Sequence, residues 1–142
     1  MKKIFIPIFV LILSACNVNK TVSHKDIINT FGEYTSPDGS YELNVKTGKG
    51  SLIEYVITEN ATSKKYQPDR LFSDAMRWYF YWENDSRLWV HSSDIGLSLW
   101  KKDSGGVFKQ VWANSDGKLN SQIPDEVYNH LPNMLKQRVK RN

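Results

Sequence analysis

The sequence predicts a mainly β fold: a small antiparallel β-sheet or sandwich domain of about six or seven strands with a short C-terminal helical segment. Three observations predict it. Apolar and polar residues alternate with a period of two, turn residues separate these segments at intervals of about 8–12 residues, and 18 residues are Phe, Tyr or Trp. Each such ring buries roughly 150–250 Å², so together they can form the core of a domain without disulfides.

The first hairpin follows from turn chemistry on both sides of an alternating strand. Ser-Pro-Asp-Gly at residues 36–39 predicts a turn, because proline presets φ and Asp-Gly tolerates a positive φ. Residues 41–46 then alternate apolar and charged or amide side chains, the pattern of a half-buried strand. Gly-Lys-Gly at residues 48–50 turns the chain into residues 51–58, which are rich in β-forming residues.

The middle of the chain is predicted to continue the antiparallel pattern. Residues 60–74 are polar and contain Pro68, which indicates a long loop or a single helical turn. Residues 76–82 form an almost unbroken aromatic strand. Further strands are expected at residues 87–91, 97–100 and 107–112.

The aromatic strand is the most informative segment, because it carries rings on both faces. One interpretation is that one face packs in the core and the other lies under the C-terminal helix. The other is that one face stays partly exposed and binds a partner, since Tyr and Trp are enriched at binding hot spots. The candidate binding residues are Trp78, Tyr79, Tyr81, Trp82, Trp89, Trp100 and Trp112.

The C-terminal region is predicted to be helical. Pro124 fits the first position of a helix, and acidic residues follow it. Pro132 must break or kink the helix, so two short pieces or one kinked helix are expected. The residues expected to share one apolar face are Val127, Leu131, Met134 and Leu135.

The N-terminal residues predict a targeting signal. Lys2 and Lys3 precede a short apolar run that ends at Leu13-Ser14-Ala15-Cys16, and Cys16 is the single cysteine. The run is too short for a membrane span, which needs roughly 20 apolar residues. These residues resemble the lipobox of bacterial lipoproteins. The resemblance implies cleavage before Cys16, acylation of its thiol with two chains, and acylation of the new amino group.

This resemblance sets the expected domain organisation. Residues 1–15 are the signal peptide, residues 16–30 the lipidated cysteine and a flexible tether, and residues 31–142 a single β-rich domain with a C-terminal helix and a basic tail. Asn17 after the cysteine resembles the outer-membrane default of Gram-negative lipoproteins. We therefore expect a lipid anchor in the outer membrane with the domain facing the periplasm, or an anchor in the cell membrane where the source has no outer membrane.

Charge and motif content argue against several function classes. Removal of Lys2 and Lys3 with the signal lowers the formal charge from +4 to +2. Four of the remaining positive charges lie in the tail rather than on a folded face, which disfavours nucleic-acid binding. These are Lys136, Arg138, Lys140 and Arg141.

The sequence also lacks the spacing of a metal site or a catalytic nucleophile. His24, His91 and His130 stand far apart, so no metal site and no cofactor are expected. Ser92 and Asp94 neighbour His91, but successive strand residues alternate faces and cannot form a triad by themselves.

We expect a membrane-anchored, non-catalytic protein-binding module whose partner is a protein of the envelope. Small single-domain lipoproteins of this kind resemble immunity and inhibitor proteins in their general plan, which implies a toxin or hydrolase as the partner. The alternatives are an accessory structural subunit of an envelope assembly or secretion machine, and a small envelope enzyme.

Overall fold

The computed structural model describes residues 20–21, 26–113 and 119–139. Its strands form a six-stranded sheet, sheet A, and a five-stranded sheet, sheet B. Sheet A contains β1 (Lys20–Thr21), β3 (Gly32–Thr35), β4 (Tyr41–Thr47), β5 (Leu52–Glu59), β6 (Lys65–Tyr66) and β7 (Phe72–Ser73). Sheet B contains β2 (Ile27–Ile28), β8 (Trp78–Trp82), β9 (Leu88–Ser92), β10 (Gly96–Lys102) and β11 (Phe108–Trp112).

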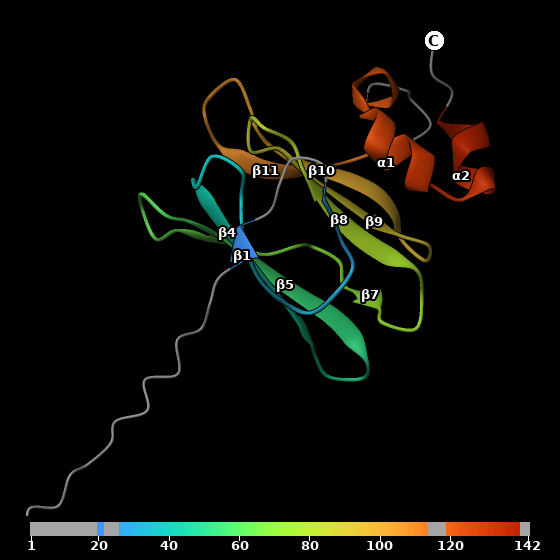
Figure 1. Cartoon of the computed structure of the whole chain (residues 1–142), viewed down its shortest axis with the longest axis horizontal. Coiled ribbons are helices and arrows are strands. Elements are labelled where there is room, and N and C mark those ends of the chain that lie inside the picture. The colour runs from blue at the N-terminus through green and yellow to red at the C-terminus, as the bar shows by residue number, and fades with distance from the viewer. Residues whose placement is uncertain (1–19, 22–25, 114–118, 140–142) are drawn as a thin grey trace, which may run out of the picture.

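The strand order confirms the predicted mainly β, antiparallel architecture. Sheet A runs β1-β3-β4-β5-β6, with β7 also paired to β5, and sheet B runs β11-β10-β9-β8-β2. Among the described pairs only β1 and β3 are parallel. A 3-10 turn (Asn120–Gln122) and the helices α1 (Asp125–His130) and α2 (Asn133–Arg138) follow the last strand, and in Figure 1 both helices lie on the side of sheet B.

The first core lies between the two sheets, and the alternation read from the sequence explains it. In β4, Tyr41, Leu43 and Val45 are all buried while the residues between them are not. Sheet B supplies the even-numbered residues of β8, including Phe80 and Trp82, which are both 0% exposed. The period of two therefore decides which half of each strand enters this core.

A second core lies between sheet B and the helical region. The odd-numbered residues of β8 and β9 face it: Tyr79, Tyr81 and Trp89 are buried there. Val127 of α1 and Leu131 are packed against them. Sheet B is therefore covered on both faces, as the first of the two interpretations of the aromatic strand predicts.

The helical region is interrupted at Pro132, as predicted: α1 ends at His130 and α2 begins at Asn133. Pro132 is the residue before α2, and its backbone carbonyl accepts hydrogen bonds from the amides of Leu135 and Lys136. Leu135 is partly buried on the second core, whereas Met134 is 74% exposed, so Met134 was wrongly placed on the apolar face.

The structure contains short strands in two segments where the sequence predicts none. Ile27 and Ile28, which their apolar side chains mark as candidates for docking on the domain, pair with Tyr81 and Phe80 of β8, and Ile28 is buried in the first core. The expected loop over residues 60–74 contains the short strands β6 and β7. Both differences arise because strands of two residues are stabilised by their partners and carry too few positions for a recognisable period.

Candidate functional site

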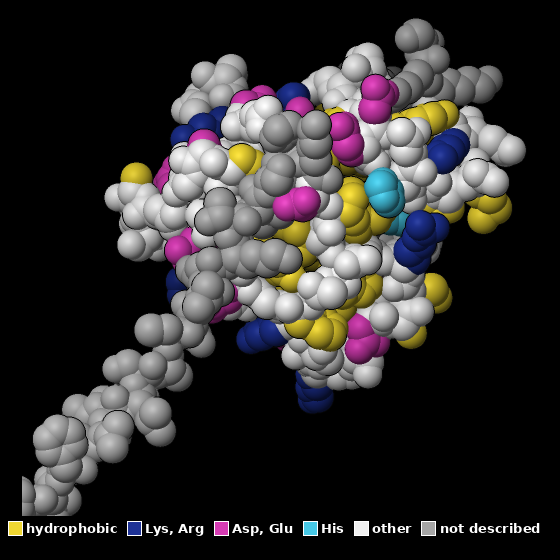
Figure 2. Space-filling model, in the orientation of Figure 1, with side chains coloured by type: hydrophobic (Ala, Val, Ile, Leu, Met, Phe, Trp, Pro, Cys, Tyr) yellow, Lys and Arg dark blue, Asp and Glu magenta, His cyan; other side chains and the backbone are white. Residues whose placement is uncertain are grey.

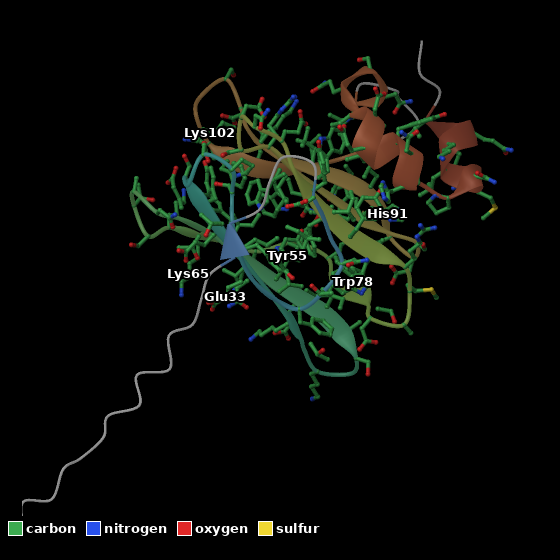
Figure 3. The ribbon with its side chains drawn as sticks, viewed as in Figure 1. Glu33, Tyr55, Lys65, Trp78, His91 and Lys102 are labelled. Carbon is green, nitrogen blue, oxygen red and sulfur yellow. The ribbon has the colours of Figure 1, made fainter. Side chains whose placement is uncertain are left out.

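Four loops meet at one end of the sandwich, and we refer to them together as the four-loop end. They are residues 36–40, 59–64, 83–87 and 102–107, which follow or precede strands of both sheets. The first three loops line one hollow of about 550 Å³, and the fourth begins beside it at Lys102, the last residue of β10. The walls of the hollow include Tyr41 and Phe108. Tyr41 and Phe108 stack with ring centroids 4.6 Å apart, so they close the core beneath the hollow. Figure 3 places Lys102 at this end, and Trp78 lies toward the other.

Asp38 holds the first loop. Its Oδ1 accepts hydrogen bonds from the hydroxyl of Ser36 at 2.8 Å and the amide of Ser40 at 2.9 Å, and its Oδ2 accepts one from the hydroxyl of Ser40 at 2.8 Å. Gly39 completes the turn with φ of +73°. Partial burial raises the pKa of Asp38, but hydrogen bonds from neighbouring serine groups outweigh it and lower the pKa to about 2.

Replacing Asp38 with alanine is expected to lower the free energy of unfolding by about 1 kcal/mol, because the loop loses several hydrogen bonds to a charged but solvent-exposed acceptor. Urea denaturation at pH 7 measures the change. The matched control is Asp69→Ala in the loop between β6 and β7, where a change within about 0.5 kcal/mol is expected. An equal loss in the two variants would contradict the assigned role of Asp38.

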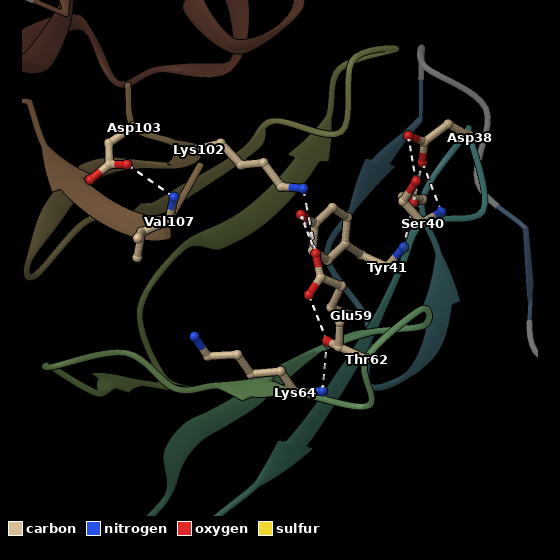
Figure 4. Close-up of polar contacts among 10 residues, drawn as sticks. Asp38, Ser40, Tyr41, Glu59, Thr62, Lys64, Lys102, Asp103 and Val107 are labelled. Carbon is tan, nitrogen blue, oxygen red and sulfur yellow. Dashed lines mark hydrogen bonds and ion pairs between the residues drawn. The ribbon is translucent and has the colours of Figure 1, made fainter. Parts of the chain in front are cut away.

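Glu59 holds the second loop and joins it to sheet B. Its Oε2 accepts a hydrogen bond from the hydroxyl of Thr62 at 2.6 Å, and the amide of Lys64 donates to that hydroxyl at 3.2 Å. Its Oε1 lies 3.4 Å from Nζ of Lys102 and 3.5 Å from the hydroxyl of Tyr41. Figure 4 shows this chain of contacts from β5 across to β10. The bond from Thr62 is the largest contribution to the lowered pKa of Glu59.

Glu83 holds the third loop. Its Oε2 lies 2.6 Å from Nη2 of Arg87 and its Oε1 accepts the indole N–H of Trp89 at 2.5 Å. Burial raises the pKa of Glu83, and the contacts with Trp89 and Arg87 oppose that rise. Arg87 also pairs with Asp85 at 2.9 Å.

Asp103 holds the fourth loop. Its Oδ1 accepts the amides of Gly105 and Val107, each at 2.9 Å, and its Oδ2 lies 2.9 Å from Nζ of Lys109. Each loop of the four-loop end therefore contains a carboxylate that fixes its backbone or its flanking side chains. Figure 2 shows cationic and anionic side chains interleaved at this end, at the upper left of the view.

The expected exposed aromatic patch is not formed. Five of its seven residues are buried in the two cores: Tyr79, Tyr81, Trp82, Trp89 and Trp100. Only Trp78 and Trp112 are partly exposed, and they lie on strands at different positions in sheet B. The helical region covers Tyr79, Tyr81 and Trp89 on one face of sheet B. Trp82 and Trp100 are buried on the other face, in the core between the two sheets. Cys16, the predicted lipidation site, lies outside the described residues.

The polar residues around His91 do not assemble into a catalytic set. Ser92 donates a hydrogen bond to Asp94, whose other oxygen accepts the amide of Ser73 at 3.0 Å. The His91 ring is 0% exposed, stacks on Tyr79 with centroids 4.8 Å apart, and has no hydrogen-bond partner on either nitrogen among the described residues. Burial, reinforced by the charge of Arg77, lowers the pKa of His91 to about 4.

No family model, curated protein or solved structure matches this chain. Within the described ranges, no three His, Cys, Asp or Glu side chains group as metal ligands. The same ranges contain no helix with the length and apolar character needed to cross a bilayer.

Proposed function

We propose that this chain is a membrane-anchored lipoprotein that acts as a non-catalytic protein-binding module of the cell envelope, and that it binds through the four-loop end. The observation that carries the proposal is that a separate carboxylate fixes each of the four loops, three of which line one hollow while the fourth begins beside it. Loops on a rigid scaffold commonly carry binding residues. Loops that are already ordered lose less conformational entropy when a partner binds.

The charges at the four-loop end support a protein partner. The side chains of Lys102 and Asp85 are 56% and 59% exposed. Opposite charges on one rim favour a partner with the complementary arrangement and disfavour others, which gives specificity. The aromatic walls lie below these charges and are themselves buried, so the rim provides the contact surface.

The lowered pKa values of two of these carboxylates support binding over catalysis at their positions. A general acid or base works best when its pKa lies near the working pH. The pKa of Asp38 is lowered to about 2 and that of Glu59 is also lowered, so both stay ionised at neutral pH. Both also use their oxygens as acceptors within the loops.

We further propose that the partner is a toxin or hydrolase that acts in the envelope and that this protein neutralises. The small single domain behind a lipobox resembles the plan of immunity and inhibitor proteins. A lipid anchor would keep the binding module at the membrane, where such a partner arrives.

The substitution Ala61→Arg tests the location of the binding surface. Ala61 is exposed and lines the hollow. An arginine at this position is expected to reduce the amount of partner captured at least tenfold without disturbing the core. Ala75→Arg is the matched control, because Ala75 is an exposed alanine before β8, at the opposite end of the sandwich. The measurement is co-purification from native membranes after reversible cross-linking.

The outcomes separate the functional alternatives. Enrichment of one envelope protein by the wild type and Ala75→Arg, but not by Ala61→Arg, supports the proposal. Sensitivity of a deletion strain to that protein supports neutralisation, whereas loss of an assembled complex in the deletion strain assigns the protein to that machine instead. If both variants capture equal amounts of the partner, the four-loop end is not part of the binding surface.

The lipid anchor is tested by Cys16→Ala. The native protein is expected to incorporate labelled palmitate and to sediment with membranes, because two or three acyl chains give long-lived attachment whereas one gives only marginal binding. The variant is expected to incorporate no label and to remain in the soluble fraction. A native protein without label would overturn the proposed anchor.

A further inference from the structure

A second hollow lies where α2 meets the start of β10, away from the four-loop end, and we refer to it as the α2 hollow. It measures about 430 Å³ and its apolar walls come from both elements. The side chains that form them are Ile95, Leu97, Leu131, Leu135 and Val139. Its size falls within the range of about 300–1,000 Å³ and its lining matches the predominantly apolar character of small-molecule sites.

The backbone at the mouth of the α2 hollow leaves room for a ligand. Gly96, which lines the hollow, has φ of +99°, and a Cβ placed on it would meet no atom within 4 Å. Leu97, next in the chain, is only 3% exposed because it packs into the second core. The hollow is therefore walled by well-packed side chains on the sheet side and open beside Gly96.

A single charged residue, Arg138, completes the described lining. It lies in the last turn of α2 and is exposed. Lys136, the other cation of that turn, is directed elsewhere, since its Nζ donates to the carbonyl of Asn129 at 3.1 Å. A guanidinium presents parallel N–H donors that match the two oxygens of a carboxylate. An apolar hollow with one such group at its edge fits a molecule with an apolar body and an anionic head.

We propose that the α2 hollow binds a single-chain fatty acid, with the alkyl chain against Ile95, Ala113 and Leu135, which are the partly exposed apolar residues of its lining, and the carboxylate at Arg138. The site is independent of the four-loop end and goes beyond the proposed protein-binding function. The charge at the edge selects a fatty acid over a neutral alcohol of the same length. The limited volume selects one alkyl chain over the two chains of a phospholipid.

Equilibrium dialysis with labelled octanoate, decanoate and laurate tests the proposal, using the full chain with Cys16→Ala so that no acyl group of its own competes. Affinity is expected to rise about fourfold for each added CH₂ as apolar surface is buried. Dodecanol, with the same alkyl chain and no charge, is expected to bind about fivefold more weakly than laurate, the scale of an exposed ion pair.

Two variants assign the binding to this hollow. Arg138→Gln is expected to lower the affinity for laurate about fivefold and to leave the affinity for dodecanol unchanged. Lys49 is an exposed cation in the turn between β4 and β5, and Lys49→Gln should change neither affinity. Ala113→Phe fills the hollow, since Ala113 lines it, and is expected to reduce laurate binding more than tenfold. Thermal unfolding of Ala113→Phe shows whether the variant is folded, and the ligand series and Arg138→Gln do not depend on it.

Three results would overturn the proposal. The first is no laurate binding below its micellar concentration, and the second is equal affinity for laurate and dodecanol. The third is loss of the envelope partner in Ala113→Phe without any laurate binding to the wild type, which would make the α2 hollow part of a protein interface. If no envelope protein is captured, the expected affinities for octanoate, decanoate and laurate stay the same, because the two sites are separate.

Discussion

Replacing Trp89 with alanine is expected to lower the free energy of unfolding by about 3–5 kcal/mol, the usual cost of removing a large buried aromatic side chain. Trp89 is 0% exposed and packs in the second core, where sheet B meets the helical region. Its indole N–H also donates to Oε1 of Glu83 at 2.5 Å, so the substitution removes a partner of a half-buried carboxylate. Because whole domains are stable by only about 5–15 kcal/mol, this one change is expected to remove a large share of the stability. Urea denaturation followed by circular dichroism measures it.

Met134→Ala is the matched control for Trp89→Ala. Met134 belongs to the same helical region but is 74% exposed, so its removal is expected to change stability by less than about 0.5 kcal/mol. A small effect of Trp89→Ala, comparable with that of Met134→Ala, would show that the helical region does not cover sheet B in solution.

Stability is also expected to fall by about 3 kcal/mol as the pH decreases from 6.5 to 4, because His91 must remain neutral in the folded state. Its ring is 0% exposed and has no hydrogen-bond partner on either nitrogen among the described residues. Burial and the charge of Arg77 lower its pKa from 6.5 to about 4. Between these pH values the unfolded chain binds a proton that the folded chain does not bind, so the free energy of unfolding decreases as the pH falls.

The substitution His91→Phe isolates this contribution. Phenylalanine keeps a ring stacked on Tyr79 but cannot be protonated, so the variant is expected to show a much smaller loss of stability between pH 6.5 and pH 4.5. His130→Gln, at an exposed position at the end of α1, should retain the wild-type slope. Urea denaturation at half-unit pH intervals provides the comparison. Parallel pH dependences of His91→Phe and the wild type would contradict the role of His91.

Much of the fold could be predicted from the sequence because its signals are local. The six strands expected from alternation and turn residues correspond to β4, β5, β8, β9, β10 and β11. The turn at residues 36–40 forms as its composition indicates, with a positive φ at Gly39 and a hydrogen bond from the amide of Ser40 to Asp38. Pro132 separates two short helices, as a residue without a backbone N–H requires.

The candidate site was harder to predict, because its members come from distant parts of the chain. Asp38 and Asp103 each precede a glycine-containing turn, a signal that could have marked them as loop-fixing carboxylates. Nothing in the spacing of Glu59 and Lys102 indicates their contact, since they lie at the ends of strands in different sheets. The seven aromatic residues were predicted to bind a partner from their residue type alone, and five of them are buried.

The sequence by itself determined which side of each long strand is apolar, where the chain turns and where the helix breaks, since side-chain alternation and proline geometry are properties of the local backbone. Only the tertiary structure decided that the odd-numbered face of β8 and β9 lies beneath α1, that Glu59 meets Lys102, and that Ile27 and Ile28 extend sheet B. These are pairings between residues far apart in the chain, and they are set by how whole layers pack to bury apolar surface rather than by any neighbouring residue.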